Sequence, residues 1–110
     1  MTTRMVPTHT ITLYVAGDLA AACAVVRKYC YESGACFTVT RTEFIYTGGE
    51  ESDITIKLVN YPRFPSAPAE QWLRCEELAE LILPALNQRT CLLVGTTETR
   101  WVVREPPGAS

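Results

Sequence analysis

Side chains able to do chemistry are few and widely spaced in this sequence. The one histidine is His9, and the cysteines are Cys23, Cys30, Cys36, Cys75 and Cys91. Zinc sites usually take Cys or His ligands in pairs two to four residues apart, whereas the shortest cysteine spacing here is six. We therefore expect no metal, no cofactor and no disulfide framework, and we expect the cysteines to be free thiols. Cys23 and Cys30 should lie on one helix face as small core residues.

The acidic turn "TGGEES", residues 47–52, is the other stretch with reactive groups. Together with Asp53, its carboxylates Glu50 and Glu51 could do acid–base work, but charges on a turn are ordinarily just solvated. The turn lacks the lysine and the glycine spacing of a phosphate-binding loop, and no GxSxG or HExxH motif occurs. These absences predict that the chain is not an enzyme.

The apolar pattern divides the chain into the elements that must position these groups. Strands are predicted over residues 9–16, 35–46, 53–59, 90–95 and 100–105. Helices are predicted over 19–33, capped by Asp18 and ended by Gly34, and over 69–88. Pro84 lies inside the second helix, where it should cause a kink or an early end.

The strand over residues 35–46 changes phase along its length. Phe37 and Val39 share one parity, while Phe44 and Tyr46 share the other. A bulge or bend near 41–43 would reconcile the two halves.

The element order is β-α-β-β-α-β with an extra C-terminal strand. It predicts an α+β, ferredoxin-like fold whose antiparallel sheet carries both helices on one face. We expect one domain over residues 1–105 and a disordered tail over 106–110. The other sheet face should be open, and its candidate residues are Thr10, Thr12, Tyr14, Thr38, Thr40, Thr55 and Lys57.

Charge and hydropathy exclude two classes of partner. The net charge is −2 and the ten basic residues are scattered, so direct nucleic-acid binding by phosphate neutralisation is not expected. The apolar run over residues 19–26 is far too short to span a membrane, and the N-terminal segment is too polar for a secretion signal. With free cysteines, this predicts a cytoplasmic protein.

The stretch "TLYVAGD", residues 12–18, is similar to the opening strand and turn of the KaiB clock proteins. The resemblance covers these seven residues, and the hairpin and proline segment that follow depart from the KaiB pattern. A resemblance over seven residues implies nothing about the fold or activity of the rest of the chain.

The proline segment "NYPRFPSAP", residues 60–68, should be near polyproline II. Tyr61 and Phe64 could lie back over the second helix near Trp72, or Arg63 and Phe64 could project as interface anchors. The second helix adds acidic residues. The predicted partner-binding residues are therefore Tyr61, Arg63, Phe64, Glu76, Glu77 and Glu80.

Two functions follow from these features. The first is a non-enzymatic protein-binding module, a small inhibitor or regulatory adaptor that docks on a basic nucleic-acid-binding protein. A phage or mobile-element inhibitor of a host nucleic-acid-binding defence complex would be such a protein. The alternative is a homodimer that pairs open sheet faces or edges around a small ligand, with Tyr14, Phe44, Tyr46 and Trp101 lining the pocket.

Overall fold

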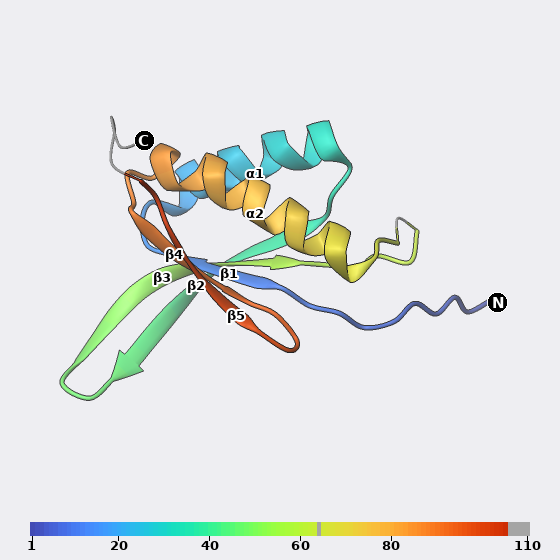
Figure 1. Ribbon diagram of the computed structural model, residues 1–110, viewed down its shortest axis with the longest axis horizontal. Coiled ribbons are helices and arrows are strands. Elements are labelled where there is room, and N and C mark those ends of the chain that lie inside the picture. Colours follow the sequence, from blue (N-terminus) through green and yellow to red (C-terminus); the bar gives the residue numbers. More distant parts are fainter. Residues whose placement is uncertain (64, 106–110) are drawn as a thin grey trace.

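The computed structural model describes residues 1–63 and 65–105 and contains two helices and one sheet. In chain order the elements are β1 (Thr12–Val15), α1 (Leu19–Ser33), β2 (Phe37–Tyr46), β3 (Gly49–Leu58), α2 (Pro68–Ala85), β4 (Thr90–Val94) and β5 (Thr99–Val103). The strands pair in the order β2-β3-β1-β4-β5, all antiparallel. Both helices cover one face of the sheet (Figure 1). The predicted ferredoxin-like α+β fold is confirmed, whereas the tail predicted over 106–110 lies outside the described residues.

Local signals fix the helix ends where the sequence predicts them. The Asp18 carboxylate accepts a hydrogen bond from the Ala21 N–H at 2.9 Å, and Gly34 ends α1 with a φ of 76°. The second helix starts with Pro68, in the first turn where proline is tolerated. It continues through Pro84 and ends at Ala85, which is the early end that this proline predicts.

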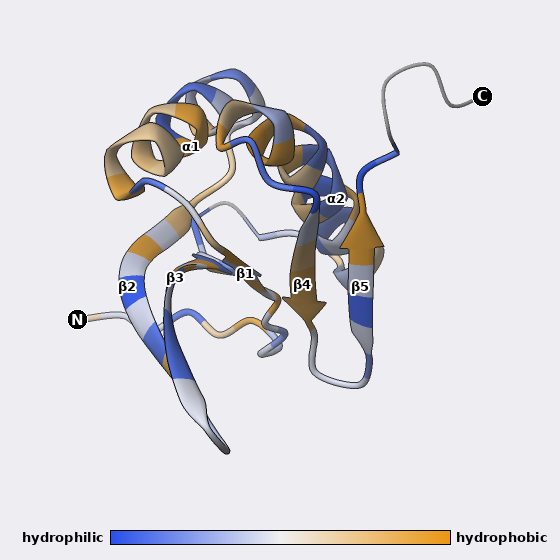
Figure 2. Ribbon diagram, turned by 90° about the vertical axis from the view of Figure 1, so that its left-hand side faces the viewer, coloured by the Kyte–Doolittle hydropathy of each residue, from blue (hydrophilic) through white to orange (hydrophobic). Residues whose placement is uncertain are grey.

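The core lies between the helices and the alternating residues of the central strands. Its strand side is formed by Ile11, Leu13, Val15, Ile54, Ile56, Leu58, Cys91 and Leu93. Figure 2 shows apolar β1 and β4 beneath the helices and hydrophilic stretches where β2 and β3 extend beyond them. This burial places the odd-numbered residues of β1 inside, together with the even-numbered residues of β3 from Ile54 to Leu58.

The buried stripe of α1 differs from the predicted one. It consists of Ala22, Val26 and Tyr29, while Cys23 and Cys30 are only partly buried. Tyr29 lies at the interface between α1 and α2, where its hydroxyl donates a hydrogen bond to Glu77 on α2 at 3.0 Å. This bond satisfies the one polar group of its side chain. The prediction that Cys23 and Cys30 are core residues is therefore wrong: both are only partly buried, and Cys30 packs against the core.

The β2–β3 hairpin contains no bulge, so the bulge predicted near residues 41–43 is wrong, while the alternative of a bend there stays a prediction. Its register runs without interruption from Phe37 opposite Leu58 to Tyr46 opposite Gly49. The hairpin projects past the helix layer (Figure 1), and its outer half has no core to face. Phe44 therefore sits on the helix-free side of the sheet, where its ring packs edge-on against Tyr14 with centroids 5.2 Å apart.

The proline segment is tied to the N-terminal segment by a polar network. Gln71 is fully buried; its Oε1 accepts from His9 Nδ1 at 2.7 Å, and its Nε2 donates to the Ser66 carbonyl at 3.2 Å. Asn60 accepts from the Ser66 N–H at 3.0 Å and donates to the Pro7 carbonyl at 3.1 Å. The segment turns at residues 62–63, so it departs from a continuous polyproline II helix. His9 is engaged as a structural residue.

The turn between β4 and β5 rests on Trp72 of α2, and this contact requires glycine. A Cβ atom at Gly95 would collide with the six-membered ring of Trp72, which is 9% exposed. We expect Gly95→Ala to lower the free energy of unfolding by about 1–3 kcal/mol through overpacking, measured by urea denaturation. Thr97→Ala, at an exposed position of the same turn, should change it by less than about 0.5 kcal/mol. Equal losses would contradict the contact.

Candidate functional site

A cavity of about 340 Å³ opens on the helix-free face of the sheet, at the carboxyl end of β1. This volume is in the range of small-molecule sites. We call it the open-face pocket. Its lining residues are Tyr14, Val15, Ala16, Phe44, Tyr46, Glu51, Asp53, Gln88, Thr90, Cys91, Leu92 and Trp101. They come from all five strands and from the loop after α2.

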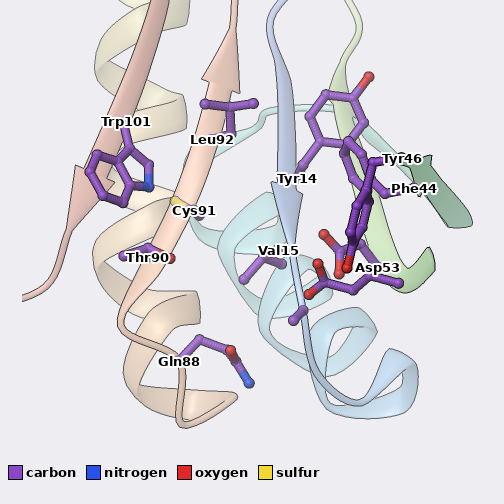
Figure 3. Close-up of a pocket in the computed structure, with 12 residues that line it drawn as sticks. Tyr14, Val15, Phe44, Tyr46, Asp53, Gln88, Thr90, Cys91, Leu92 and Trp101 are labelled. Carbon is purple, nitrogen blue, oxygen red and sulfur yellow. The ribbon is translucent and has the colours of Figure 1, made fainter. Parts of the chain in front are cut away.

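Aromatic side chains form two sides of the open-face pocket. Tyr14, Phe44 and Tyr46 lie together on one side, and Trp101 lies on the other, across β4 (Figure 3). Trp101 is opposite Leu92 in the β4–β5 register, and its side chain is 71% exposed. The structure thus brings together the four aromatic residues that the sequence analysis grouped around a ligand, while ligand binding and the homodimer stay predictions.

The rest of the helix-free face is polar, as the strand alternation predicts. Thr12 lies opposite Lys57 and Tyr14 opposite Thr55 in the β1–β3 register. In the next pair Thr38 faces Lys57 and Thr40 faces Thr55. Thr10 precedes β1 and lies outside the sheet. This face therefore combines a hydroxyl-lined half with the aromatic and acidic half that holds the pocket.

Two carboxylates of β3, Glu51 and Asp53, also line the pocket. The Oδ1 atom of Asp53 is buried and has no hydrogen-bond partner among the described residues. Burial raises the pKa of the Asp53 carboxyl, and the negative charges of Glu51 and Glu43 raise it further. No cation of the described residues pairs with that buried oxygen. It can therefore accept a hydrogen bond from a cationic or other hydrogen-bond-donating ligand.

The prediction that these carboxylates are solvated residues of a turn is wrong for Asp53. The β3 strand begins at Gly49, whereas the strand predicted over 53–59 began only with Asp53, so Glu51 is a strand residue as well. Asp53 shares its parity with Thr55 and Lys57, which the sequence already assigned to the helix-free face. Extending that alternation back to Asp53 and Glu51 was the signal that could have found both residues on this face.

The raised pKa of Asp53 gives a stability prediction. A carboxyl whose pKa is higher in the folded than in the unfolded state is destabilising when ionised, at pH values above the folded pKa. Asp53→Asn should therefore raise the melting temperature at pH 7. The gain should shrink as the pH falls through the raised pKa towards the ordinary value near 3.8. Thermal unfolding of both proteins between pH 4 and 8 measures this, and a melting temperature lowered at pH 7 would contradict it.

Cys75 and Cys91 are buried, and neither is set up as a nucleophile. Burial raises the pKa of the Cys75 thiol to about 12 and that of Cys91 to about 11. No group of His, Cys, Asp and Glu residues in 1–63 and 65–105 could hold a metal ion. The same residues include no helix long and apolar enough to cross a membrane.

The thiol pKa values predict the order of alkylation. At pH 7.5 in the folded protein, Cys23 and Cys36 should react with iodoacetamide before Cys75 and Cys91, since only the thiolate attacks and the last two are buried as well. Cys30 should react more slowly than Cys23 and Cys36, because partial burial raises the pKa of its thiol. Peptide mass spectrometry over time measures each site. After denaturation all five should react at similar rates. Early labelling of Cys75 or Cys91 in the folded protein would contradict their burial.

Three of the residues predicted to bind a protein partner, Tyr61, Arg63 and Phe64, belong to the proline segment. Tyr61 is about half exposed, at 47%, and Arg63 is exposed. Phe64 lies outside the described residues. The two alternatives for Phe64, a place in the core or at an interface, stay predictions. Partner binding through the proline segment also stays a prediction.

The acidic residues of α2 point to different neighbours. Glu76 pairs with Arg100 of β5, and Glu77 accepts the hydrogen bond from Tyr29 of α1. Glu80 is exposed. Two of these three carboxylates thus have structural partners within the chain, and their binding role remains a prediction.

No protein-family model matches the chain, and no curated protein matches it. Among solved structures it resembles a phage SAM lyase in its apo state, with a TM-score of 0.66 and 9% identity over 89% of this chain and 90% of that one. It also resembles a phage SAM lyase in complex with S-methyl-5'-thioadenosine, with a TM-score of 0.60 and 10% identity over 88% and 90% of the two chains. At this identity the similarity shows a shared fold.

The comparison corrects the predicted function. The expectation of a non-enzymatic inhibitor or adaptor is contradicted, because the fold is shared with an enzyme over 89% of this chain. The prediction that the chain is not an enzyme, which was based on missing catalytic motifs, is contradicted by the same finding.

Proposed function

We propose that the chain is an enzyme that binds S-adenosylmethionine in the open-face pocket and cleaves it to S-methyl-5'-thioadenosine. The observation that carries this proposal is the pocket itself: aromatic walls and an unpaired carboxylate oxygen on a fold shared with phage SAM lyases. The substrate has an adenine ring, a sulfonium cation and an α-ammonium group, and the pocket offers chemistry for each of them.

The aromatic walls suit the nucleoside and the sulfonium. An adenine ring stacks well on an exposed indole such as that of Trp101. A sulfonium cation is attracted to the faces of rings such as those of Tyr14 and Phe44. With adenine against Trp101, the sulfur would reach towards the three aromatic residues across the pocket.

The carboxylates suit the α-ammonium group better than the sulfonium. Cleavage removes the positive charge from sulfur, so a carboxylate beside the sulfur would stabilise the substrate more than the transition state. The ammonium keeps its charge throughout the reaction. We therefore assign the ammonium group to Asp53, with Glu51 beside it, and the sulfonium to the aromatic side.

The bond changes explain how such a site works without a nucleophilic side chain. Release of S-methyl-5'-thioadenosine breaks the bond between sulfur and Cγ of the methionyl group, and the electron pair stays on sulfur. If the substrate's own carboxylate forms the new bond to Cγ, the second product is a five-membered lactone and no proton moves. If a proton leaves Cβ instead, the product is an unsaturated amino acid and a base is needed.

The lactone route needs little from the protein beyond shape and environment. Its nucleophile and its leaving group belong to one molecule, so the pocket has to hold the methionyl chain folded with its carboxylate near Cγ. Cation and anion neutralise each other in the transition state, and an apolar aromatic lining favours such charge loss relative to water. Aromatic walls next to a carboxylate anchor provide both conditions.

Incubation of the purified chain with S-adenosylmethionine in H₂¹⁸O tests the proposal. Mass spectrometry should detect S-methyl-5'-thioadenosine together with either the lactone or the unsaturated acid. Incorporation of ¹⁸O at Cγ would show hydrolysis instead of lyase chemistry. Asp53→Asn, purified in the same way, controls for contaminating enzymes. Absence of product, together with no calorimetric binding of the thioadenosine, would overturn the proposal.

A further inference from the structure

We propose that Arg100 is a positioning residue for the open-face pocket. Its contacts on the helix side of β5 hold the strand so that Trp101, the next residue, forms the pocket wall on the other side. We call Arg100 with Trp72, Glu76 and Glu98 the Arg100 clamp. The inference rests on the proposed function for its ligand, but the clamp itself is a geometric feature of the fold.

The Arg100 clamp is a charged and aromatic contact between β5 and α2. The guanidinium carbon of Arg100 lies 3.9 Å from the centroid of the Trp72 ring. The same guanidinium pairs with Glu76 of α2 and, through Nε at 3.0 Å, with Glu98. Stacking and ion pairing together fix a planar guanidinium better than either does alone.

Strand β5 needs such a contact because it is an edge strand. It pairs with β4 alone, from Thr90 opposite Val103 to Val94 opposite Thr99. Trp101 has little packing of its own, since its side chain is 71% exposed. The turn end of this hairpin is held at Gly95, which lies against Trp72. Trp72 therefore contacts both the β4–β5 turn, at Gly95, and strand β5, at Arg100.

Strand geometry couples the two sides of β5. Successive side chains point to opposite faces of a strand, so Arg100 faces α2 while Trp101 faces the pocket. A shift or fraying of β5 that separates Arg100 from Trp72 must also displace the Trp101 indole. Holding that indole in its binding position in the free protein removes an ordering cost from ligand binding.

The test is a double-mutant cycle on the affinity for S-methyl-5'-thioadenosine, with wild type, Arg100→Gln, Trp101→Ala and the double variant. Isothermal titration should show Arg100→Gln binding about 3- to 10-fold more weakly than wild type. In the Trp101→Ala background the same change should have no further effect. Arg74→Gln, which removes an ion pair with Glu70 elsewhere on α2, should leave the affinity unchanged. Independent, additive losses would overturn the proposal.

A readout without ligand separates this inference from the proposed function. The chain has two tryptophans, so 5-fluorotryptophan labelling gives two ¹⁹F resonances, and Trp101→Ala assigns them. Arg100→Gln should shift or broaden the Trp101 resonance. That result supports the clamp even if the wild-type protein binds no nucleoside. Failure of the wild type to bind would refute only the proposed function. An unchanged Trp101 resonance would overturn the clamp, and Arg100→Lys serves the same test if the Gln variant does not fold.

Discussion

Asp53→Asn should weaken binding of S-adenosylhomocysteine about 10- to 100-fold while changing the affinity for S-methyl-5'-thioadenosine less than about twofold. The homocysteine compound carries the α-ammonium group on an uncleavable thioether, and the thioadenosine lacks that group. A hydrogen bond to a charged partner contributes about 1.5–3 kcal/mol, which gives this range. Isothermal titration of both ligands measures the difference, and kcat/KM for S-adenosylmethionine should fall in parallel.

Glu50→Gln is the matched control for this prediction. Glu50 lies in the same strand, is exposed, and pairs in register with Ile45 on the opposite face from Phe44. Its replacement removes the same charge without touching the pocket, so both affinities should be unchanged. Equal weakening of both ligands by Asp53→Asn would mean that the carboxylate maintains the shape of the pocket, and the assignment of the ammonium group to Asp53 would be wrong.

The same substitution is expected to stabilise the fold, and the two effects together indicate function. Asp53 is partly buried next to Glu51, and its ionised form is unfavourable in the folded chain. A residue that costs stability and raises affinity is the pattern expected of a binding site. Loss of both stability and binding would instead describe an ordinary structural residue.

The sequence predicted the fold well because the decisive signals are local. Alternation through Leu13 and Val15 and through Ile54 and Ile56 identified the buried side of the central strands. Asp18 and Gly34 fixed the ends of α1 by capping chemistry that acts over a few residues. The element order then left few ways to pair the strands.

The site was harder to predict because its parts are distant in sequence. Phe44 and Trp101 become the two walls of one pocket only through the sheet order that places β3, β1 and β4 between their strands. The phase change at Phe44 was attributed to a bulge or bend, because the sequence does not show that the hairpin runs past the helices. The carboxylate of Asp53 was interpreted as a solvated turn charge, although the predicted strand began with this residue, because the polar start of β3 resembles a turn.

The absence of catalytic motifs misled the functional prediction for a chemical reason. Motifs record side chains that attack, transfer protons or hold metals. A cleavage whose nucleophile is part of the substrate requires none of these, only a pocket that folds and desolvates its ligand. For the proposed function, aromatic residues on an open sheet face are therefore the more informative feature, and the sequence did predict that all four of them line one pocket.

Trp101→Ala should weaken binding of S-methyl-5'-thioadenosine and S-adenosylhomocysteine alike, by about 5- to 100-fold. Stacking of a base on an aromatic side chain contributes about 1–3 kcal/mol, and both ligands carry adenine. Because the indole is 71% exposed, the melting temperature should hardly change. Val103→Ala, on the same face of β5 but outside the pocket lining, should leave both affinities unaltered.

Unchanged binding by Trp101→Ala would place adenine on the opposite wall, where Phe44→Ala should then produce the loss. If neither variant binds more weakly, adenine does not occupy this pocket.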